Sequence, residues 1–128
     1  MVNRVHIMLM VKTIVKQSNI EGAGLGLFAD EFIPKGTMIF QEDTFSISFT
    51  EDEFEKLSKI QKDFIHTYGY IRDGIWRCSL DNDRFTNHSD NPNCDDSLNC
   101  CQTFAIRDIE IGEEITTNYY VVGCPKDF

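Results

Sequence analysis

Alternating apolar and polar positions recur in short runs along the chain and predict strands. From position 45 to 49, apolar side chains occupy every second position with serines between them, which is the periodicity of a half-buried strand. The stretch 5–16 is rich in β-branched and long apolar residues and lacks Gly and Pro, so it predicts one or two strands. The apolar runs 25–29 and 37–40 flank a turn that contains Pro and Gly, and they predict a strand pair.

One segment instead repeats with the period of a helix. Thr50 and Glu53 have the spacing of a capping box, in which each side chain accepts a hydrogen bond from the other residue's backbone N–H. Apolar residues then recur three and four positions apart, which predicts one main helix over about 51–66. Its inward-facing positions would be Phe54, Leu57, Gln61, Phe64 and Ile65.

A tight turn and a polar segment organise the rest of the chain. Asp73 and Gly74 separate two strand-like runs and tolerate the positive φ angles of a hairpin turn. From 80 to 96 the residues are mostly Asp, Asn and Ser, which predicts a long loop, and long ordered loops usually carry function. Short strands broken at Gly112 follow, so a mostly β single domain is predicted over 1–128.

Length, composition and charge narrow the class of protein. The 128 residues are 41% hydrophobic, which is enough to bury a core and excludes a disordered chain. The 12 Lys and Arg against 21 Asp and Glu give a net charge of −9 without any basic cluster, so direct nucleic-acid binding is not expected. A partner selected by charge would be basic. No segment has the length of a membrane span or the pattern of a secretory signal.

The five cysteines form no metal-binding or disulfide pattern. They lack C-x-x-C spacing and are odd in number, so neither a disulfide framework nor a self-contained zinc site is predicted. Reduced thiols predict an intracellular protein, cytoplasmic in a bacterium and with the nucleus permitted in a eukaryote. The cysteines are Cys78, Cys94, Cys100, Cys101 and Cys124.

Two short motifs leave alternatives open when they are taken singly. Gly22, Gly24 and Gly26 have G-x-G-x-G spacing instead of the dinucleotide-binding G-x-G-x-x-G, and a Pro follows before any helix could form. A strained turn and a ligand-binding loop are equally expected there. His88 near Cys94 allows a Cys-His nucleophile pair, although a His88 whose ring nitrogens are satisfied by the polar loop is favoured.

Two other features have ordinary structural explanations. Glu113 and Glu114 are adjacent, so on a strand their side chains point to opposite faces and cannot share one substrate. One of the two is expected to be solvated beside the corner at Gly112. The default role of a core aromatic with its hydroxyl at the surface applies to Tyr68, Tyr70, Tyr119 and Tyr120.

Three segments, taken in their order, resemble the SET-domain family of protein lysine methyltransferases. They are GAGLGLFADEFIPKGTMI, RFTNHSDNPNC and AIRDIEIGEEITTNYY, and the resemblance extends over about 11–120. The passage TYGYIRDGIWRCSLDNDRF is similar to the insert of compact, stand-alone members of bacterial or viral type. The resemblance implies the β-clip SET fold, with several small twisted sheets and a C-terminal segment threaded beneath a loop in a pseudoknot-like arrangement.

The resemblance also implies a binding site for S-adenosyl-L-methionine. The backbone of Gly24, Leu25 and Gly26 would approach the methionine part of this cofactor, where a side chain at either glycine would collide. The Asn87 amide would hydrogen-bond the same part, and the His88 main chain would recognise the adenine edge.

A second set of residues would form the reaction centre and the lysine channel. By resemblance, Tyr119 occupies the position of the family's active-site tyrosine, whose hydroxyl lies where the methyl group meets the incoming lysine amine. Positioning and charge stabilisation matter more than proton shuttling in such a methyl transfer, and no metal is needed. The candidates for the aromatic channel are Tyr68, Tyr70 and Tyr120.

The sequence departs from the family pattern at two places. Asp90 stands where many members have a Cys that holds zinc together with a post-SET segment, and the chain ends four residues after Cys124, so no zinc is expected. In the family, the post-SET segment also forms part of one wall of the substrate channel. Here that wall would come from 121–128, from the hairpin or from a second subunit. The last possibility predicts a homodimer, which a mass measurement in solution tests. Asn118 replaces the usual Asp, which keeps a hydrogen-bond acceptor but removes the charge.

These features together favour an S-adenosylmethionine-dependent protein lysine N-methyltransferase that acts on a basic, Lys-rich protein, histone-like or other. One alternative is a non-catalytic SET-like module that binds a peptide or the cofactor. Another is methylation of a small amine or of an N-terminal amine. An acidic surface around the lysine channel would attract a Lys-rich tail, with general solubility as the simpler explanation of the charge.

Overall fold

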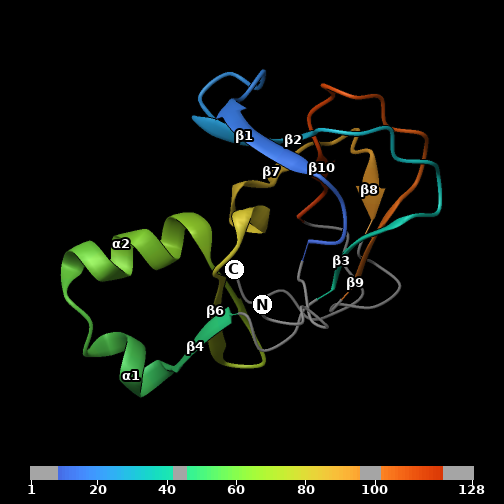
Figure 1. Ribbon diagram of the computed structural model, residues 1–128. Coiled ribbons are helices and arrows are strands. Elements are labelled where there is room, and N and C mark those ends of the chain that lie inside the picture. Colours follow the sequence, from blue (N-terminus) through green and yellow to red (C-terminus); the bar gives the residue numbers. More distant parts are fainter. Residues whose placement is uncertain (1–8, 42–45, 96–101, 120–128) are drawn as a thin grey trace, which may run out of the picture.

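Small sheets and two helices make up the part of the chain that the computed structural model describes, residues 9–41, 46–95 and 102–119 (Figure 1). The helices are α1 (Glu51–Glu55) and α2 (Lys59–Tyr68), and a 3-10 turn covers Asn82–Phe85. The strands are β1 (Thr13–Gln17), β2 (Leu25–Ala29), β3 (Met38–Gln41), β4 (Ser46–Thr50), β5 (Tyr70–Arg72), β6 (Ile75–Ser79), β7 (Asn87–His88), β8 (Cys94–Asp95), β9 (Gln102–Ala105) and β10 (Thr116–Thr117). The prediction of a mostly β fold of several small sheets is confirmed.

The strands pair differently from the expectation. β2 pairs antiparallel with β1, and β3 pairs antiparallel with β9, so the predicted pair of 25–29 with 37–40 is wrong. The segment between these two strands bonds to a distant stretch, through the Ile33–Ile109 bridge and a 2.8 Å hydrogen bond from Gly36 N to Ala105 O. These long-range bonds hold β3 beside β9. The alternation of apolar and polar residues along one strand does not specify which strand it pairs with.

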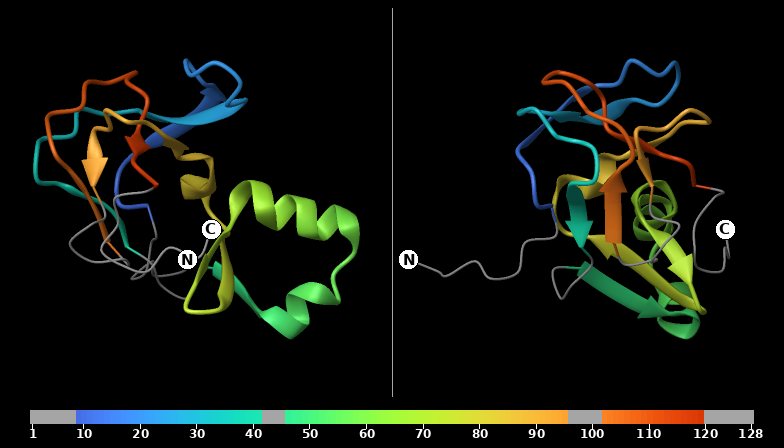
Figure 2. Two further views of the ribbon diagram at one scale, coloured as in Figure 1. Left: turned by 180° about the vertical axis from the view of Figure 1, so that it is seen from behind. Right: turned by 90° about the vertical axis from the view of Figure 1, so that its right-hand side faces the viewer.

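The elements form two groups in space. The sheet β4-β6-β5 and both helices project to one side, while the sheets β1-β2, β3-β9-β8 and β10-β7 gather on the other (Figures 1 and 2). Tyr68 at the end of α2 lies edge-on to Phe85, with ring centroids 5.4 Å apart. Because Phe85 also packs against the main core, this aromatic contact joins the two groups.

Each group has its own buried cluster. In the smaller cluster, beneath the helices, the Trp76 ring stacks on the Phe54 ring with centroids 4.4 Å apart. Burial of Cys78 in that cluster raises the pKa of its thiol, so this cysteine is an apolar core residue. The largest fully buried aliphatic residues of the main core are Leu27, Ile33, Ile39, Ile109 and Ile115.

The predicted helix over 51–66 is two helices separated by a turn at 56–58. The capping box of Thr50 and Glu53 is present at the start of α1, and the hydrogen bonds from Thr50 hold the pKa of Glu53 below its ordinary value. A second capping box starts α2, where Ser58 Oγ accepts from Gln61 N (3.2 Å) and Gln61 Oε1 accepts from Ser58 N (2.9 Å). The chain therefore ends one helix and begins another at Ser58.

The break changes which side chains are buried. Phe54 of α1 and Ile65 of α2 lie in the small cluster, as expected, and Leu57 packs against it from the turn. Gln61 and Phe64 were expected to face inward, and both are exposed, Phe64 to 45%. Because the turn at 56–58 separates the two helices, the three- and four-residue spacing of apolar positions counted from α1 does not predict which side chains of α2 face inward.

Replacement of Ser58 by Ala is expected to lower the free energy of unfolding by about 1 kcal/mol, because the first turn of α2 loses its cap. A thermal or denaturant melt measures the change. Ser48→Ala, at an exposed position of β4, is the matched control and should stay within about 0.5 kcal/mol of the wild type. Equal losses for the two variants would contradict a capping role for Ser58.

The hairpin is confirmed, and the long polar loop is not a simple loop. Asp73 and Gly74 have φ angles of 54° and 75°, as the tight turn between β5 and β6 requires. The stretch 80–96 contains the 3-10 turn, β7 and β8, and Asp81 fixes its start by accepting hydrogen bonds from Leu9 N (2.9 Å) and Asp83 N (3.0 Å). Over its described residues, 80–95, the polar segment is therefore held at Asp81, β7 and β8.

Candidate functional site

The C-terminal stretch from 113 to 117 runs between β2 and the polar segment. On one side Ala29 N donates to Glu113 O (2.9 Å) and Ile115 N donates to Leu27 O (2.8 Å). On the other side β10 pairs in parallel with β7, and Ser89 N donates to Thr117 O (2.9 Å). The three motif segments therefore meet here. The predicted threading of the C-terminus involves 120–128, which lie outside the described residues, and stays a prediction.

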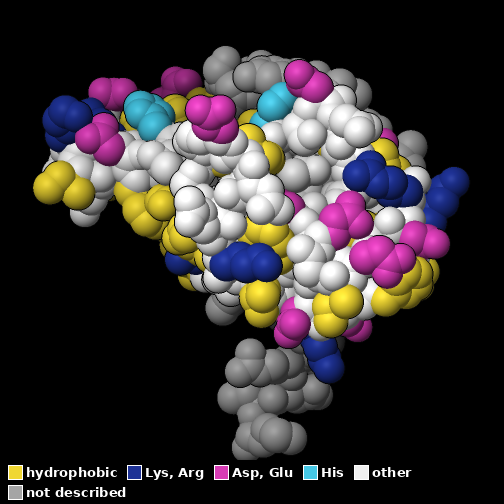
Figure 3. All heavy atoms as spheres, turned by 90° about the horizontal axis from the view of Figure 1, so that it is seen from above, with side chains coloured by type: hydrophobic (Ala, Val, Ile, Leu, Met, Phe, Trp, Pro, Cys, Tyr) yellow, Lys and Arg dark blue, Asp and Glu magenta, His cyan; other side chains and the backbone are white. Residues whose placement is uncertain are grey.

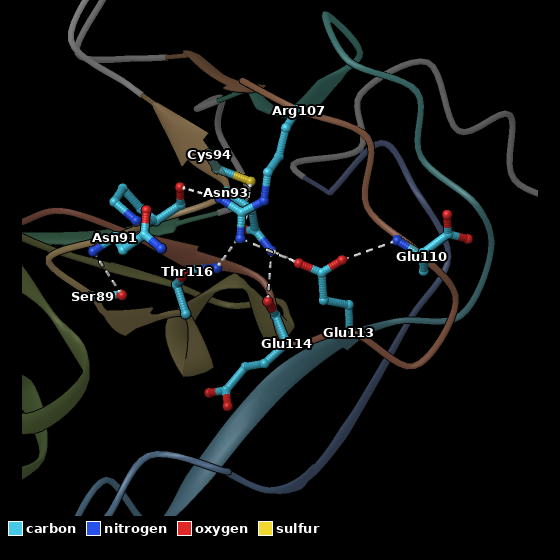
Figure 4. Close-up of polar contacts among 10 residues, drawn as sticks. Ser89, Asn91, Asn93, Cys94, Arg107, Glu110, Glu113, Glu114 and Thr116 are labelled. Carbon is cyan, nitrogen blue, oxygen red and sulfur yellow. Dashed lines mark hydrogen bonds and ion pairs between the residues drawn. The ribbon is translucent and has the colours of Figure 1, made fainter.

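A buried asparagine pins the C-terminal stretch in place. Asn93, only 1% exposed, donates from Nδ2 to Glu114 O (2.7 Å) and to Glu113 Oε2 (3.1 Å), and its Oδ1 accepts from Thr116 N (2.9 Å) (Figure 4). Arg107 approaches the same Glu113 carboxylate at 3.4 Å. The side-chain amide thus satisfies main-chain groups that no strand partner reaches.

Asn93→Ala is expected to destabilise the fold by at least about 2 kcal/mol, because it leaves a buried carbonyl and a buried N–H without their partner. Chemical denaturation compares it with Asn91→Ala, a control at an exposed neighbouring position that should change stability by no more than about 0.5 kcal/mol. A similar small effect at both positions would show that Asn93 does not pin the stretch.

The glycine-rich segment forms a strained turn that leads into β2. Gly22 and Gly24 have φ angles of 79° and 76°, and Ser18 N donates to Gly24 O (2.8 Å) across the turn. The interpretation as a turn is confirmed, and its use as a ligand loop stays a prediction. Gly26 follows inside β2 and is buried against Glu114 and Asn87: an added Cβ would lie 3.0 Å from Glu114 Cδ and 3.2 Å from Asn87 Nδ2. Only a glycine fits at this point.

Asn87 in β7 reaches the glycine-rich segment directly. Its side-chain Nδ2 donates to Leu25 O (3.0 Å) and to Glu114 Oε2 (3.0 Å). Both N–H bonds of the amide are used in this way, so Oδ1 is the atom that Asn87 can offer to a ligand. An amide oxygen accepts hydrogen bonds and suits a ligand that donates them.

Glu114 is a functional candidate that sequence reasoning missed. The expectation that the two glutamates face opposite ways is confirmed (Figure 4), but the second of them is buried, 9% exposed. Its carboxylate accepts from Ser18 Oγ (2.7 and 2.9 Å), from Asn19 N (3.0 Å) and from Asn87 Nδ2. Ser18 and Asn19 open the glycine-rich turn, so Glu114 joins that turn to β7. No local pattern signals these partners.

His88 is held by polar neighbours on both sides of its ring. Its Nε2 lies 2.9 Å from Asp90 Oδ1, and its Nδ1 accepts a hydrogen bond from Tyr119 N (3.1 Å). The favoured interpretation of a satisfied histidine is confirmed, although the ring is half-buried instead of fully buried. Cys94 is buried and its thiol donates to Asn93 Oδ1 (3.4 Å), and the Cys-His nucleophile pair stays the less favoured hypothesis.

Tyr119 lies beside the group formed by Asn87, His88 and Glu114, and it is 40% exposed. Its hydroxyl donates to the main-chain carbonyl of Thr86, the residue that precedes Asn87, and its ring centroid lies 5.3 Å from that of His88. The default role of a core aromatic is therefore wrong for Tyr119. The cofactor candidates 24–26, 87 and 88 and the catalytic candidate are thus brought to one place.

The channel candidates are placed unequally. Tyr68 contacts Phe85, two residues before Asn87, and so borders the cluster. Tyr70 lies in β5 opposite Arg77, within the sheet of the helical unit. Tyr120 lies outside the described residues.

The described ranges contain neither a metal-binding cluster nor a helix that could span a membrane. No group of three or more His, Cys, Asp and Glu side chains there could hold a metal ion. Three of the five cysteines lie outside those ranges, so the expected absence of zinc stays a prediction. No helix in the described part of the chain is long and apolar enough to cross a membrane.

Several solved structures share this fold. Chaetomium thermophilum Polycomb Repressive Complex 2 is 25% identical, with 86% of this chain and 16% of that chain covered and a TM-score of 0.66. The same complex bound to S-adenosylmethionine is 24% identical, with coverages of 84% and 15% and a TM-score of 0.61. A Plasmodium falciparum protein proposed to be a histone methyltransferase is 24% identical, with coverages of 87% and 95% and a TM-score of 0.61.

This chain corresponds to a small part of the polycomb chains and matches one family model over most of its own length. The chain spans about 15% of the polycomb chains that it matches. A comparison with curated protein sequences gave no match. The family model of the SET domain matches residues 24–120, which include Gly24 and Gly26 of the glycine-rich segment, the Asn87-His88 strand and Tyr119. The chain belongs to the SET-domain family.

Proposed function

We propose that this protein is an S-adenosylmethionine-dependent protein lysine N-methyltransferase whose substrate is a basic, Lys-rich protein. The observation that carries the proposal is that the consecutive residues Thr86 and Asn87 hydrogen-bond to Tyr119 and to the glycine-rich segment, respectively. Asn87 is bonded to the backbone of the glycine-rich segment, and the carbonyl of Thr86 accepts the hydroxyl of Tyr119. A cofactor site and a catalytic hydroxyl would thus adjoin. The S-adenosylmethionine-bound polycomb structure supports the choice of cofactor.

The residues present fit this cofactor. Asn87 Oδ1 is an acceptor, as the ammonium group of the methionine part requires, and space is open at Gly24, where an added Cβ would meet no atom within 4 Å. The backbone of 24–26 and the His88 main chain would hold the rest of the molecule. When bound, S-adenosylmethionine supplies a methyl group on a positively charged sulfur.

The chain's own groups would then orient the substrate amine. Because the Tyr119 hydroxyl donates to Thr86 O, its oxygen is presented as an acceptor that can direct the N–H bonds of a lysine amine. Main-chain carbonyls beside it, such as that of Thr86, favour positive charge on the reacting atoms. A lysine stem between aromatic side chains loses hydration, which lowers the pKa of its ammonium and releases the neutral amine.

Calorimetric titration with S-adenosylmethionine, followed by incubation of Lys-rich proteins with methyl-labelled cofactor, tests the proposal. We expect saturable binding and transfer of label. Absence of binding would reject a cofactor-dependent enzyme. Tight binding without transfer to any Lys-rich protein would reject catalysis and leave a SET-like binding module.

The acidity of the chain leads to a salt-dependent prediction. Carboxylates are spread over the face seen in Figure 3 and alternate with basic side chains, and the net charge of −9 sets the long-range field. We expect the KM for a Lys-rich protein to rise severalfold between about 0.01 M and about 0.15 M ionic strength, because the Debye length falls from about 30 Å to about 8 Å. Steady-state kinetics measures this. A KM that does not respond to salt would leave general solubility as the explanation of the charge.

A further inference from the structure

Among the carboxylates of residues 9–41, 46–95 and 102–119, Glu114 is the buried one, and the hydrogen bonds that it accepts come from neutral groups. Ser18 Oγ donates to both of its oxygens, and Asn19 N and Asn87 Nδ2 donate to one oxygen each. Burying a carboxylate without a cationic partner is unfavourable, and hydrogen bonds from several donors offset that cost. A neutral side chain would cost less free energy to bury here, so stability alone does not explain why a glutamate occupies this position.

The carboxylate determines how the Asn87 amide is oriented. An ionised carboxylate can only accept hydrogen bonds, so it must be faced by the NH2 group of Asn87 and not by its oxygen. The carbonyl of Leu25 makes the same demand on the other N–H. Both acceptors therefore keep Nδ2 turned toward β2 and Glu114, so Oδ1, at the other edge of the planar amide group, is turned away from them.

A glutamine at this position could not replace the glutamate. Oε1 of Glu114 accepts from Ser18 and Asn19, and Oε2 accepts from Ser18 and Asn87. Glutamine has one oxygen and one NH2 group, so its NH2 group would face either Asn19 N–H or the Asn87 NH2 group, and neither of these can accept a hydrogen bond, although the Ser18 hydroxyl could. Either the turn at Ser18 or the amide of Asn87 would have to move.

We propose that Glu114 is a positioning residue of the cofactor site: it fixes the Asn87 amide with its oxygen turned outward and ties it to the glycine-rich turn, so that the site selects a ligand bearing an ammonium group. This inference rests on the proposed function and names the group that gives it ligand specificity. Glu114 acts through Asn87 and does not itself touch the ligand. The position of Gly26 is part of the arrangement, since a Cβ there would displace the carboxylate.

Two ligands separate positioning from general structural support. S-adenosylmethionine carries the amino-acid part, and 5′-methylthioadenosine has the same nucleoside with a methylated sulfur, which is an uncharged thioether, but lacks the amino-acid part. We expect Glu114→Gln to weaken binding of S-adenosylmethionine by at least about tenfold in calorimetry, while the Kd for 5′-methylthioadenosine changes by less than about twofold. Glu110→Gln, which removes the same charge at an exposed position nearby, should change neither Kd.

The remaining outcomes are also decisive. Equal weakening of both ligands, or no change in either, would overturn the positioning role. If the wild type binds neither ligand, the proposed function fails, and the inference fails with it. If Glu114→Gln does not fold, Ser18→Ala takes its place, because it removes one donor and leaves Asn87 and Glu114 intact. A severalfold loss for S-adenosylmethionine alone would then support the role, and a parallel loss or no loss would overturn it.

A double-mutant cycle gives an independent readout. Because Glu114 is proposed to act through Asn87, Glu114→Gln should have little further effect on S-adenosylmethionine affinity once Asn87 is Ala. Additive losses in the double variant would contradict a shared route. Thermal melts of the variants without ligand show whether each one is folded.

Discussion

Tyr119→Phe is expected to lower turnover by about 10²-fold or more while changing the Kd for S-adenosylmethionine by less than about twofold. The substitution removes one oxygen, the atom that donates to Thr86 O and that would orient the lysine amine. It keeps the ring that lies 5.3 Å from His88, so the packing of the site should persist. Single-turnover kinetics and calorimetry measure the two quantities separately.

The ratio of the two effects is the informative result. A loss of affinity as large as the loss of turnover would mean that Tyr119 supports the cofactor site as a whole. Unchanged turnover would remove Tyr119 from the reaction centre and would favour another hydroxyl or a non-catalytic module. A thermal melt of the variant controls for unfolding, since the hydroxyl also holds the Thr86 carbonyl.

Gly26→Ala is expected to destabilise the fold by about 1–3 kcal/mol and to abolish tight cofactor binding. Gly26 does not have a positive φ angle, so the backbone would accept alanine, and the damage comes from contact with the Glu114 carboxylate and the Asn87 amide. Displacing these two groups would undo the orientation of Oδ1. Denaturant melts and calorimetric titration measure the two effects.

A matched background isolates the cause of that damage. In Glu114→Ala the carboxylate that lies nearest to the added Cβ is absent and only the Asn87 contact at 3.2 Å remains, so Gly26→Ala should then cost much less stability than it does in the wild type. An equal cost in both backgrounds would contradict the steric explanation. The comparison needs only the free energy of unfolding and does not depend on the proposed activity.

Local features of the fold could be predicted from the sequence, but long-range pairings could not. The strand 25–29, the capping box at Thr50 and the Asp73-Gly74 hairpin each depend on neighbouring residues and were predicted correctly. The partner of β3 was not, because alternation identifies a strand without identifying its neighbour. The helix break was missed because apolar spacing continues across it, although Ser58 and Gln61 repeat the capping signal.

The candidate site divides in the same way. Asn87 and Tyr119 were expected from the resemblance to a family, and the contacts bring both to one place. Glu114 could not be found by such reasoning, because its donors Ser18 and Asn87 are 96 and 27 positions away. A buried carboxylate becomes meaningful only when its donors are known.

Mass spectrometry of a Lys-rich protein after incubation with this chain and S-adenosylmethionine is the most direct test of lysine methylation by this protein. We expect methyl groups on lysine side chains when the wild type is present, and strongly reduced modification with Tyr119→Phe. Absence of any methylated lysine, with a wild-type protein that binds the cofactor, would reject lysine methylation, and so would methyl groups found only on N-terminal amines.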